Sequence, residues 1–214
     1  MGMRGLRRRL SRMLYDGRYG VETSDVVRLE DLGLAAEERV DYEPSDWRTL
    51  ARVLRRRDVS EDDVFLDYGA GMGRILIQAG AYRFKRVIGV ELSEQLSQVA
   101  RRNAEHRSEL QDGRLEIVTT DATAYALPDD VTVIFMHSPF KGAIFRSVLE
   151  RIGESLDRRP RSLRLIYKNP EEHAAVIATG RFEQTGDWRP LRARLRGSDD
   201  FGLVRTYETA DNRS

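Results

Sequence analysis

Short apolar segments alternate along this chain with longer segments in which apolar residues recur every three or four positions. The short segments are rich in Val, Ile, Leu and Phe, which is typical of strands buried on both faces of a sheet. They predict strands at residues 64–67, 86–91, 115–119, 131–136 and 162–167. The longer segments predict helices from the glycines after residue 67 to about residue 82, and at 93–109, 143–156 and 171–178. Such alternation favours a mostly parallel sheet with helices on both faces.

Two further apolar segments close the pattern. Residues 181–188 and 202–208 are rich in Phe, Trp, Val, Thr and Tyr, and no helical pattern separates them. We expect them to form a C-terminal antiparallel hairpin at one edge of the sheet.

The N-terminal region lacks this alternation. Residues 1–18 carry six arginines, with Leu6, Leu10, Met13 and Leu14 at helical spacing. This pattern fits a helix with a solvated arginine face, and it also fits a lid or a patch for an acidic partner. Residues 19–44 are irregular, and a helix is expected to begin at Ser45. We therefore predict an N-terminal extension over residues 1–41 and one domain over residues 42–214.

Composition narrows the class of protein. A chain of 214 residues is long enough for one α/β domain with a proper core. A net charge of +1 gives no overall case for nucleic-acid binding, and the absence of cysteine excludes disulfides, thiolate catalysis and zinc–thiolate sites. No apolar segment is long enough to span a bilayer or to form a secretory signal. These features predict a cytoplasmic protein with no membrane partner.

A glycine-rich turn follows the first strand. In Asp67-Tyr-Gly-Ala-Gly-Met-Gly73, the glycines allow a sharp turn from strand to helix and a close approach of a ligand to the backbone. Dinucleotide-binding proteins use a similar loop with the pattern G-x-G-x-x-G. Here the position of the last glycine is taken by Arg74, and Asp67 would repel a pyrophosphate. A carboxylate suits a ligand with an amino group and no phosphate, such as S-adenosylmethionine.

Two acidic residues extend this candidate site. Glu91 ends the second strand, eighteen residues after Gly73, where its two oxygens can accept hydrogen bonds from both hydroxyls of a ribose. Asp121 follows the third strand, where it can accept from an adenine amino group while the amide of Ala122 donates to a ring nitrogen. Together with the glycine loop, they predict a three-point site for adenosine.

These residues resemble the class I, Rossmann-like S-adenosylmethionine-dependent methyltransferases over residues 42–208. Tyr42-Glu-Pro and the loop motif are also similar to the non-SET histone lysine methyltransferases, and more closely to small bacterial methyltransferases. The resemblance implies a three-layer α/β methyltransferase fold, S-adenosylmethionine as cofactor and S-adenosylhomocysteine as product. It implies that the cofactor contacts Tyr42, Asp67, Gly69, Ala70, Gly71, Gly73, Glu91, Leu92, Asp121, Ala122 and His137.

The fourth strand ends in His137-Ser138-Pro139-Phe140, where amino-group methyltransferases often have Asn-Pro-Pro-Phe. His137 and Ser138 are the candidate catalytic residues. His137 is either a general base or a neutral hydrogen-bonding residue beneath the cofactor. Tyr19, Pro139 and Phe140 are the candidate residues for binding the methyl acceptor. The ends of the fourth and fifth strands lack the acidic cluster that magnesium needs, so we expect no metal.

Several functions are compatible with this pattern. The first is methyl transfer to a nitrogen or oxygen nucleophile of a small molecule or peptide. The second is methylation of RNA or protein lysine, which the arginines at residues 189–196 and in the N-terminal segment favour slightly. The third is a cofactor-binding partner subunit without catalysis. A nicotinamide oxidoreductase is disfavoured by Asp67 and Arg74.

Overall fold

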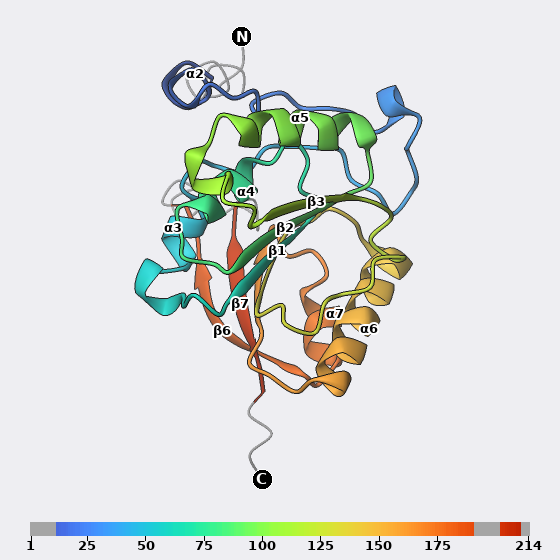
Figure 1. Ribbon diagram of the computed structural model, residues 1–214. Helices are drawn as coiled ribbons and strands as arrows, with labels where there is room; N and C mark the ends of the chain where they lie inside the picture. The colour runs from blue at the N-terminus through green and yellow to red at the C-terminus, as the bar shows by residue number, and fades with distance from the viewer. Residues whose placement is uncertain (1–11, 191–201, 211–214) are drawn as a thin grey trace.

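In the described part of the chain, seven short strands, of which the four central ones are buried at nearly every position, build one mixed sheet. We describe residues 12–190 and 202–210 from a computed structural model (Figure 1). In these residues the strand order is β3-β2-β1-β4-β5-β7-β6. The strands are β1 (Val64–Tyr68), β2 (Arg86–Glu91), β3 (Leu115–Thr119), β4 (Val133–His137), β5 (Arg164–Lys168), β6 (Phe182–Trp188) and β7 (Val204–Thr209). β1 to β5 are parallel, whereas β7 is antiparallel to both β5 and β6. The predicted α/β fold with a C-terminal antiparallel pair is confirmed.

Helices cover both faces of the sheet (Figure 1). One core packs α6 (Gly142–Arg158) and α7 (His173–Ala178) against Leu66 and Tyr68. The other core packs α3 (Thr49–Val53), α4 (Arg74–Gly80) and α5 (Glu94–Glu105) against Phe65. Neighbouring residues of β1 therefore serve opposite cores, as a strand buried on both faces requires.

Two helix boundaries differ by four residues from the sequence prediction, and the others differ by two or fewer. The helix expected from Ser45 begins at Thr49, because the carbonyl and hydroxyl of Ser45 are held by Arg74 and His137. The helix expected to reach residue 109 ends at Glu105, and a 3-10 turn follows at Ser108–Leu110. Ser93 caps α5 as predicted, since its hydroxyl accepts from the amide of Leu96.

Residues 16–48, which we call the cover segment, lie against the carboxyl ends of the strands. The segment begins at the last residue of a π-helical turn, Arg12–Asp16, and it contains the short helix α2 (Gly17–Tyr19) and a 3-10 turn at Glu30–Leu32. Its isolated β-bridges pair Val27 with Tyr42 and Arg39 with Phe140. The carboxylate of Glu38 accepts from the amides of Ala143 and Ile144 at the start of α6. The predicted helix over residues 1–18 falls mostly outside the described residues.

In the described part of the chain, no helix is long and apolar enough to cross a membrane.

Candidate cofactor site

The glycine loop joins β1 to α4 through three left-handed residues, Gly69, Gly71 and Gly73, with φ of 75°, 54° and 82°. A Cβ added at Gly69 would lie 2.5 Å from Cβ of Pro139, and one at Gly71 would lie 2.1 Å from Cε2 of Tyr42. Both the backbone conformation and the close neighbours therefore require glycine here. The loop brings the end of β1, the loop after β4 and the cover segment together around one cavity.

The cavity lies at the carboxyl ends of the strands and holds about 910 Å³ of space, open solvent included. Its lining includes many of the predicted residues, namely Tyr42, Asp67, Gly69, Ala70, Glu91, Leu92, Asp121, Ala122, His137, Pro139 and Phe140. The structure thus brings these predicted residues together around one cavity.

Asp67 is a buried carboxylate that lines this cavity. Its exposure is 2%, and among the described residues no hydrogen bond or ion pair reaches its side chain. Burial and the nearby charge of Glu91 raise the pKa of Asp67 well above its usual range. A buried carboxylate without a partner is costly, so this position suits a cationic ligand group.

Glu91 is held in place by the glycine loop. Its Oε2 accepts from the amide of Gly71 at 2.8 Å, and its Oε1 accepts from the amide of Ser93 at 2.9 Å. Burial raises the pKa of Glu91, although these backbone bonds oppose the shift. Each carboxylate oxygen has two acceptor sites, so the backbone amides leave part of the accepting capacity of Glu91 free.

Asp121 is engaged on both oxygens. Oδ2 accepts from Nη2 of Arg39 at 3.0 Å, and Oδ1 accepts from the amide and hydroxyl of Thr123 at 2.9 and 2.7 Å. Partial burial alone would raise the pKa of Asp121, but the bonds from Thr123 and Arg39 lower it overall. Arg39 therefore links the cover segment to the wall predicted to bind adenine.

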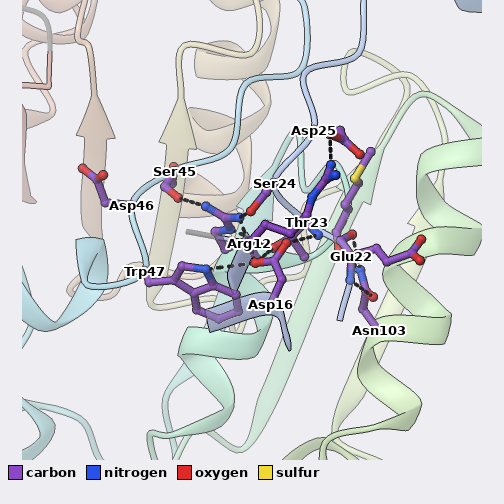
Figure 2. A network of polar contacts seen from close by, with 12 residues as sticks. Arg12, Asp16, Glu22, Thr23, Ser24, Asp25, Ser45, Asp46, Trp47 and Asn103 are labelled. Atoms are coloured by element: carbon purple, nitrogen blue, oxygen red, sulfur yellow. Dashed lines mark hydrogen bonds and ion pairs between the residues drawn. The ribbon is translucent and has the colours of Figure 1, made fainter. Parts of the chain in front are cut away.

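Arg74, the first residue of α4, fastens the cover segment to the glycine loop. Its Nε donates to Oγ1 of Thr23, its Nη1 to the carbonyl of Ser45, and its Nη2 to Oγ of Ser24 and Oδ1 of Asp16. The exposures of Arg74 and Asp16 are 5% and 3%. Figure 2 shows Asp16, Thr23, Ser24 and Ser45 as neighbours in this polar network. All three nitrogens of the guanidinium thus donate to the cover segment, which offsets much of the cost of burying this arginine.

His137 lies at the end of β4 between two polar side chains. Its Nδ1 is 3.0 Å from Oγ of Ser45, and its Nε2 is 3.1 Å from Nδ2 of Asn169. Burial and the nearby charge of Lys168 lower the pKa of His137 well below its usual range. With both nitrogens engaged and the neutral form favoured, the geometry supports a hydrogen-bonding residue over a general base.

Some predicted residues lie outside the cavity lining. The ring of Tyr19 packs on Trp47, with 5.0 Å between ring centroids, rather than against the site predicted for the acceptor. The hydroxyl of Ser138 donates to the carbonyls of Lys168 and Asn169 and so joins the ends of β4 and β5. Gly71 and Gly73 shape the loop from behind the lining. The described residues contain no cluster of His, Asp and Glu able to hold a metal.

Sequence reasoning did not single out Arg39, Ser45 or Asn169 as site residues. Each meets its partner across a long stretch of chain, such as the 82 residues from Arg39 to Asp121. The φ of 49° at Asn169 and of 39° at Ser138 marks the strand ends as unusual, because left-handed non-glycine residues cluster at functional sites. That signal appears only in the structure.

Similarity to known proteins supports this site. The model of the family described as histone methylation protein DOT1 matches residues 41–113, about a third of the chain, including the glycine loop and Glu91. A protein-lysine N-methyltransferase of Saccharolobus islandicus is 36% identical over 67 residues, which are 31% of this chain and 42% of that protein. The chain thus matches less than half the length of this curated relative.

Solved structures share the fold. The YcgJ protein of Bacillus subtilis has a TM-score of 0.56 at 13% identity, over 77% of this chain and 98% of that one. An RNA methyltransferase of Salinibacter ruber, in complex with S-adenosylhomocysteine, has a TM-score of 0.52 at 20% identity, over 80% of this chain and 95% of that one. The chain thus has the Rossmann-like fold of class I S-adenosylmethionine-dependent methyltransferases, and its two sequence matches are to a histone methylation family and to a protein-lysine methyltransferase.

Proposed function

We propose that this protein binds S-adenosylmethionine in the cavity described above and transfers its methyl group to the side-chain amine of a protein lysine. Cofactor binding is supported by the buried carboxylate of Asp67, which lines the cavity beside the glycine loop and has no partner within residues 12–190 and 202–210. The ammonium of the cofactor would supply that partner. Glu91 would accept from the ribose hydroxyls, and Asp121 with Ala122 would contact the adenine.

The charge of the cavity supports a cationic acceptor. The charged residues in its lining are Asp41, Glu43, Asp67, Glu91 and Asp121 against Arg39 and Arg74. Both arginines are already engaged in ion pairs, with Asp121 and Asp16. The exposed carboxylates of Asp41 and Glu43 would attract a lysine ammonium and repel the phosphates of RNA. The two sequence matches also carry descriptions of histone or protein-lysine methylation.

The chain's own residues would bind, orient and desolvate the acceptor. S-adenosylmethionine supplies an electrophilic methyl group on a sulfonium, so alignment of the amine contributes much of the rate. The acceptor amine must lose its proton before it can act as a nucleophile. Val40, Pro139, Phe140 and Ile144 give the cavity an apolar side, which favours the neutral amine over the ammonium.

Cofactor binding is tested by calorimetric titration with S-adenosylmethionine, S-adenosylhomocysteine and NAD. We expect the first two to bind and NAD not to bind. Glu91→Ala should weaken binding, whereas Glu183→Ala, on the exposed face of β6, should leave it unchanged. Binding of NAD alone would contradict the proposal.

The acceptor is tested with S-adenosylmethionine labelled in the methyl group. The protein is incubated with lysine-containing peptides, with the same peptides carrying acetyl-lysine, and with total RNA. We expect label in the unmodified peptides and recovery of methyl-lysine after hydrolysis. Label in RNA or only in small molecules would overturn the lysine assignment, and binding without any transfer would favour a partner subunit without catalysis.

A further inference from the structure

A chain of hydrogen bonds runs from the C-terminal hairpin through β5 and β4 to the cover segment. It begins at Asn169, whose Oδ1 accepts from the amide of Gly202 at 2.6 Å. A backbone N–H can only donate, so this bond fixes which end of the Asn169 amide is the oxygen. The backbone N–H of Asn169 also donates to the carbonyl of Leu203 at 2.8 Å, which anchors the residue. The NH₂ group of Asn169 must therefore face His137.

The orientation of Asn169 determines where His137 carries its proton. Nδ2 of Asn169 lies 3.1 Å from Nε2 of the imidazole and has only hydrogens to offer. Nε2 must therefore accept, and in the neutral ring the proton resides on Nδ1. The carbonyl of Glu43 also accepts a hydrogen bond from this ring, which agrees with an N–H on the side of the cover segment.

The proton on Nδ1 in turn determines the direction of the Ser45 hydroxyl. Oγ of Ser45 lies 3.0 Å from Nδ1 and must accept from it. Its own hydrogen is then directed elsewhere, and no acceptor in the described residues takes it. Ser45 is buried, with 4% exposure, yet it lines the cavity. The hydroxyl is thereby left as a donor toward the bound ligand.

We propose that Asn169 is a positioning residue: it holds His137 as the Nδ1–H tautomer, and this tautomer leaves the Ser45 hydroxyl free to donate to the carboxylate of the cofactor. The inference rests on the proposed function for the identity of the ligand. The carboxylate is the anionic group of S-adenosylmethionine, and it shares a carbon with the ammonium assigned to Asp67.

The tautomer is measured without any ligand or activity. Two-dimensional NMR of protein with ¹⁵N-labelled histidine distinguishes protonated from bare ring nitrogens, and His106→Gln and His173→Gln assign the three histidines. We expect His137 to show a protonated Nδ1 and a bare Nε2 across neutral pH. A protonated Nε2 in the unaltered protein would overturn the proposal.

Asn169→Asp tests the consequence for binding. At a pH where His137 is neutral, the new carboxylate requires a hydrogen on Nε2, so Nδ1 becomes bare and takes the Ser45 hydrogen. We expect S-adenosylhomocysteine to bind at least about tenfold more weakly, the loss of one hydrogen bond to a charged group. The affinity for 5′-methylthioadenosine, which lacks the amino-acid group, should not change. As the pH falls and His137 becomes doubly protonated, the loss should shrink, because Nδ1 again donates to Ser45.

The controls separate this effect from damage to the fold. The charged groups around the ring include Lys168 on β5 and Glu43 and Asp46 in the cover segment, while Asp67 and Arg74 line the same cavity, so each variant is compared with the unaltered protein at the same pH. Ser45→Ala should reduce the affinity for S-adenosylhomocysteine by the same factor at every pH. In the Ser45→Ala background, Asn169→Asp should cause no further loss of affinity. Gln184→Glu, exposed on β6, should have no effect.

Equal weakening of both ligands by Asn169→Asp would overturn the role of Ser45. If S-adenosylhomocysteine does not bind the unaltered protein, the proposed function fails and the role of Ser45 fails with it, whichever tautomer is found.

Discussion

Two buried carboxylates, Asp67 and Glu91, stand at the ends of neighbouring strands without a cation among the described residues near them. Glu91 has backbone donors, whereas Asp67 has none. Burial and the charge of Glu91 raise the cost of charging Asp67, and the pKa of Asp67 rises accordingly. Such a site is unfavourable for folding and favourable for a cationic ligand. Stability and binding should therefore respond in opposite directions when Asp67 is neutralised.

Asp67→Asn should stabilise the protein and weaken the binding of the cofactor. The amide has the shape of the carboxylate but no charge to desolvate, so we expect about 1–3 kcal/mol of added stability at pH 8. S-adenosylmethionine should bind about ten- to a hundredfold more weakly, because a hydrogen bond to a charged group is lost. Urea unfolding and calorimetry measure the two effects. Asp187→Asn on β6 is the control, and parallel losses of stability and affinity would contradict the prediction.

The raised pKa of Asp67 also predicts a pH dependence. The folded state holds this proton more tightly than the unfolded chain, so the ligand-free protein should lose stability as pH rises from the ordinary carboxylate pKa through the raised one. Binding of an ammonium reverses the shift, so a proton should be released and the affinity should rise over the same range. Calorimetry in two buffers of different ionisation enthalpy measures the released proton. Uptake of a proton on binding would contradict this assignment.

The ion pair between Arg39 and Asp121 competes with the predicted adenine contact. Both side chains are about one-third exposed, so the pair contributes at most about 1 kcal/mol. Arg39→Gln should therefore raise the affinity for S-adenosylmethionine by up to about fivefold, because Asp121 no longer has to leave a partner. Asp121→Asn should lower the affinity for S-adenosylmethionine both in the unaltered protein and in the Arg39→Gln variant. Competition binding measures these changes, and a large loss with Arg39→Gln would show that Arg39 itself contacts the ligand.

At the scale of elements, consecutive apolar residues and glycines carried most of the prediction. The parallel strands, the hairpin and the loop after β1 depend on local pattern and on which face is buried, so sequence was sufficient. The start of α3 was not predictable. Ser45 has a side chain that favours a helix N-cap, but its carbonyl is bonded to Arg74 and its hydroxyl to His137. Those partners lie 29 and 92 residues away, and only the assembled sheet brings them near.

The glycine loop offers a test at this scale. Gly71→Ala combines a left-handed φ of 54° with a clash against the ring of Tyr42. Gly113→Ala has an equally left-handed φ of 83° but no atom within 4 Å of the new Cβ. Gly113→Ala should cost about 1–2 kcal/mol of stability and leave binding intact. Gly71→Ala should cost more stability than Gly113→Ala, and it should also weaken the binding of S-adenosylmethionine. Equal stability losses, measured by urea unfolding, would show that Tyr42 moves aside freely.

At the scale of the whole molecule, the cover segment is built into the domain. The predicted boundary at residue 41 falls inside a region whose contacts reach α4, α5 and α6. Asn103 on α5 donates to the carbonyl of Glu22, and Glu38 accepts from the start of α6. The alternation of apolar residues could not reveal this, because the segment is joined through polar groups and through scattered apolar residues, such as Val21 and Trp47, that follow no period. We infer that residues 16–48 and the sheet unfold together.

The pair formed by Arg74 and Asp16 tests that inference. Arg74→Met leaves the Asp16 carboxylate buried without its cation, so we expect a loss of about 3–5 kcal/mol and weaker cofactor binding. Arg181→Met breaks an exposed pair with Asp157 and should cost less than about 1 kcal/mol. In the background Trp188→Phe, Trp47 fluorescence reports on the cover segment while circular dichroism reports on the whole fold. Coincident urea transitions are expected, because the buried pair joins the two parts into one cooperative unit. If the protein that keeps both Arg74 and Asp16 shows the fluorescence transition at a lower urea concentration than the circular dichroism transition, the cover segment opens by itself. Arg74 then serves only local packing.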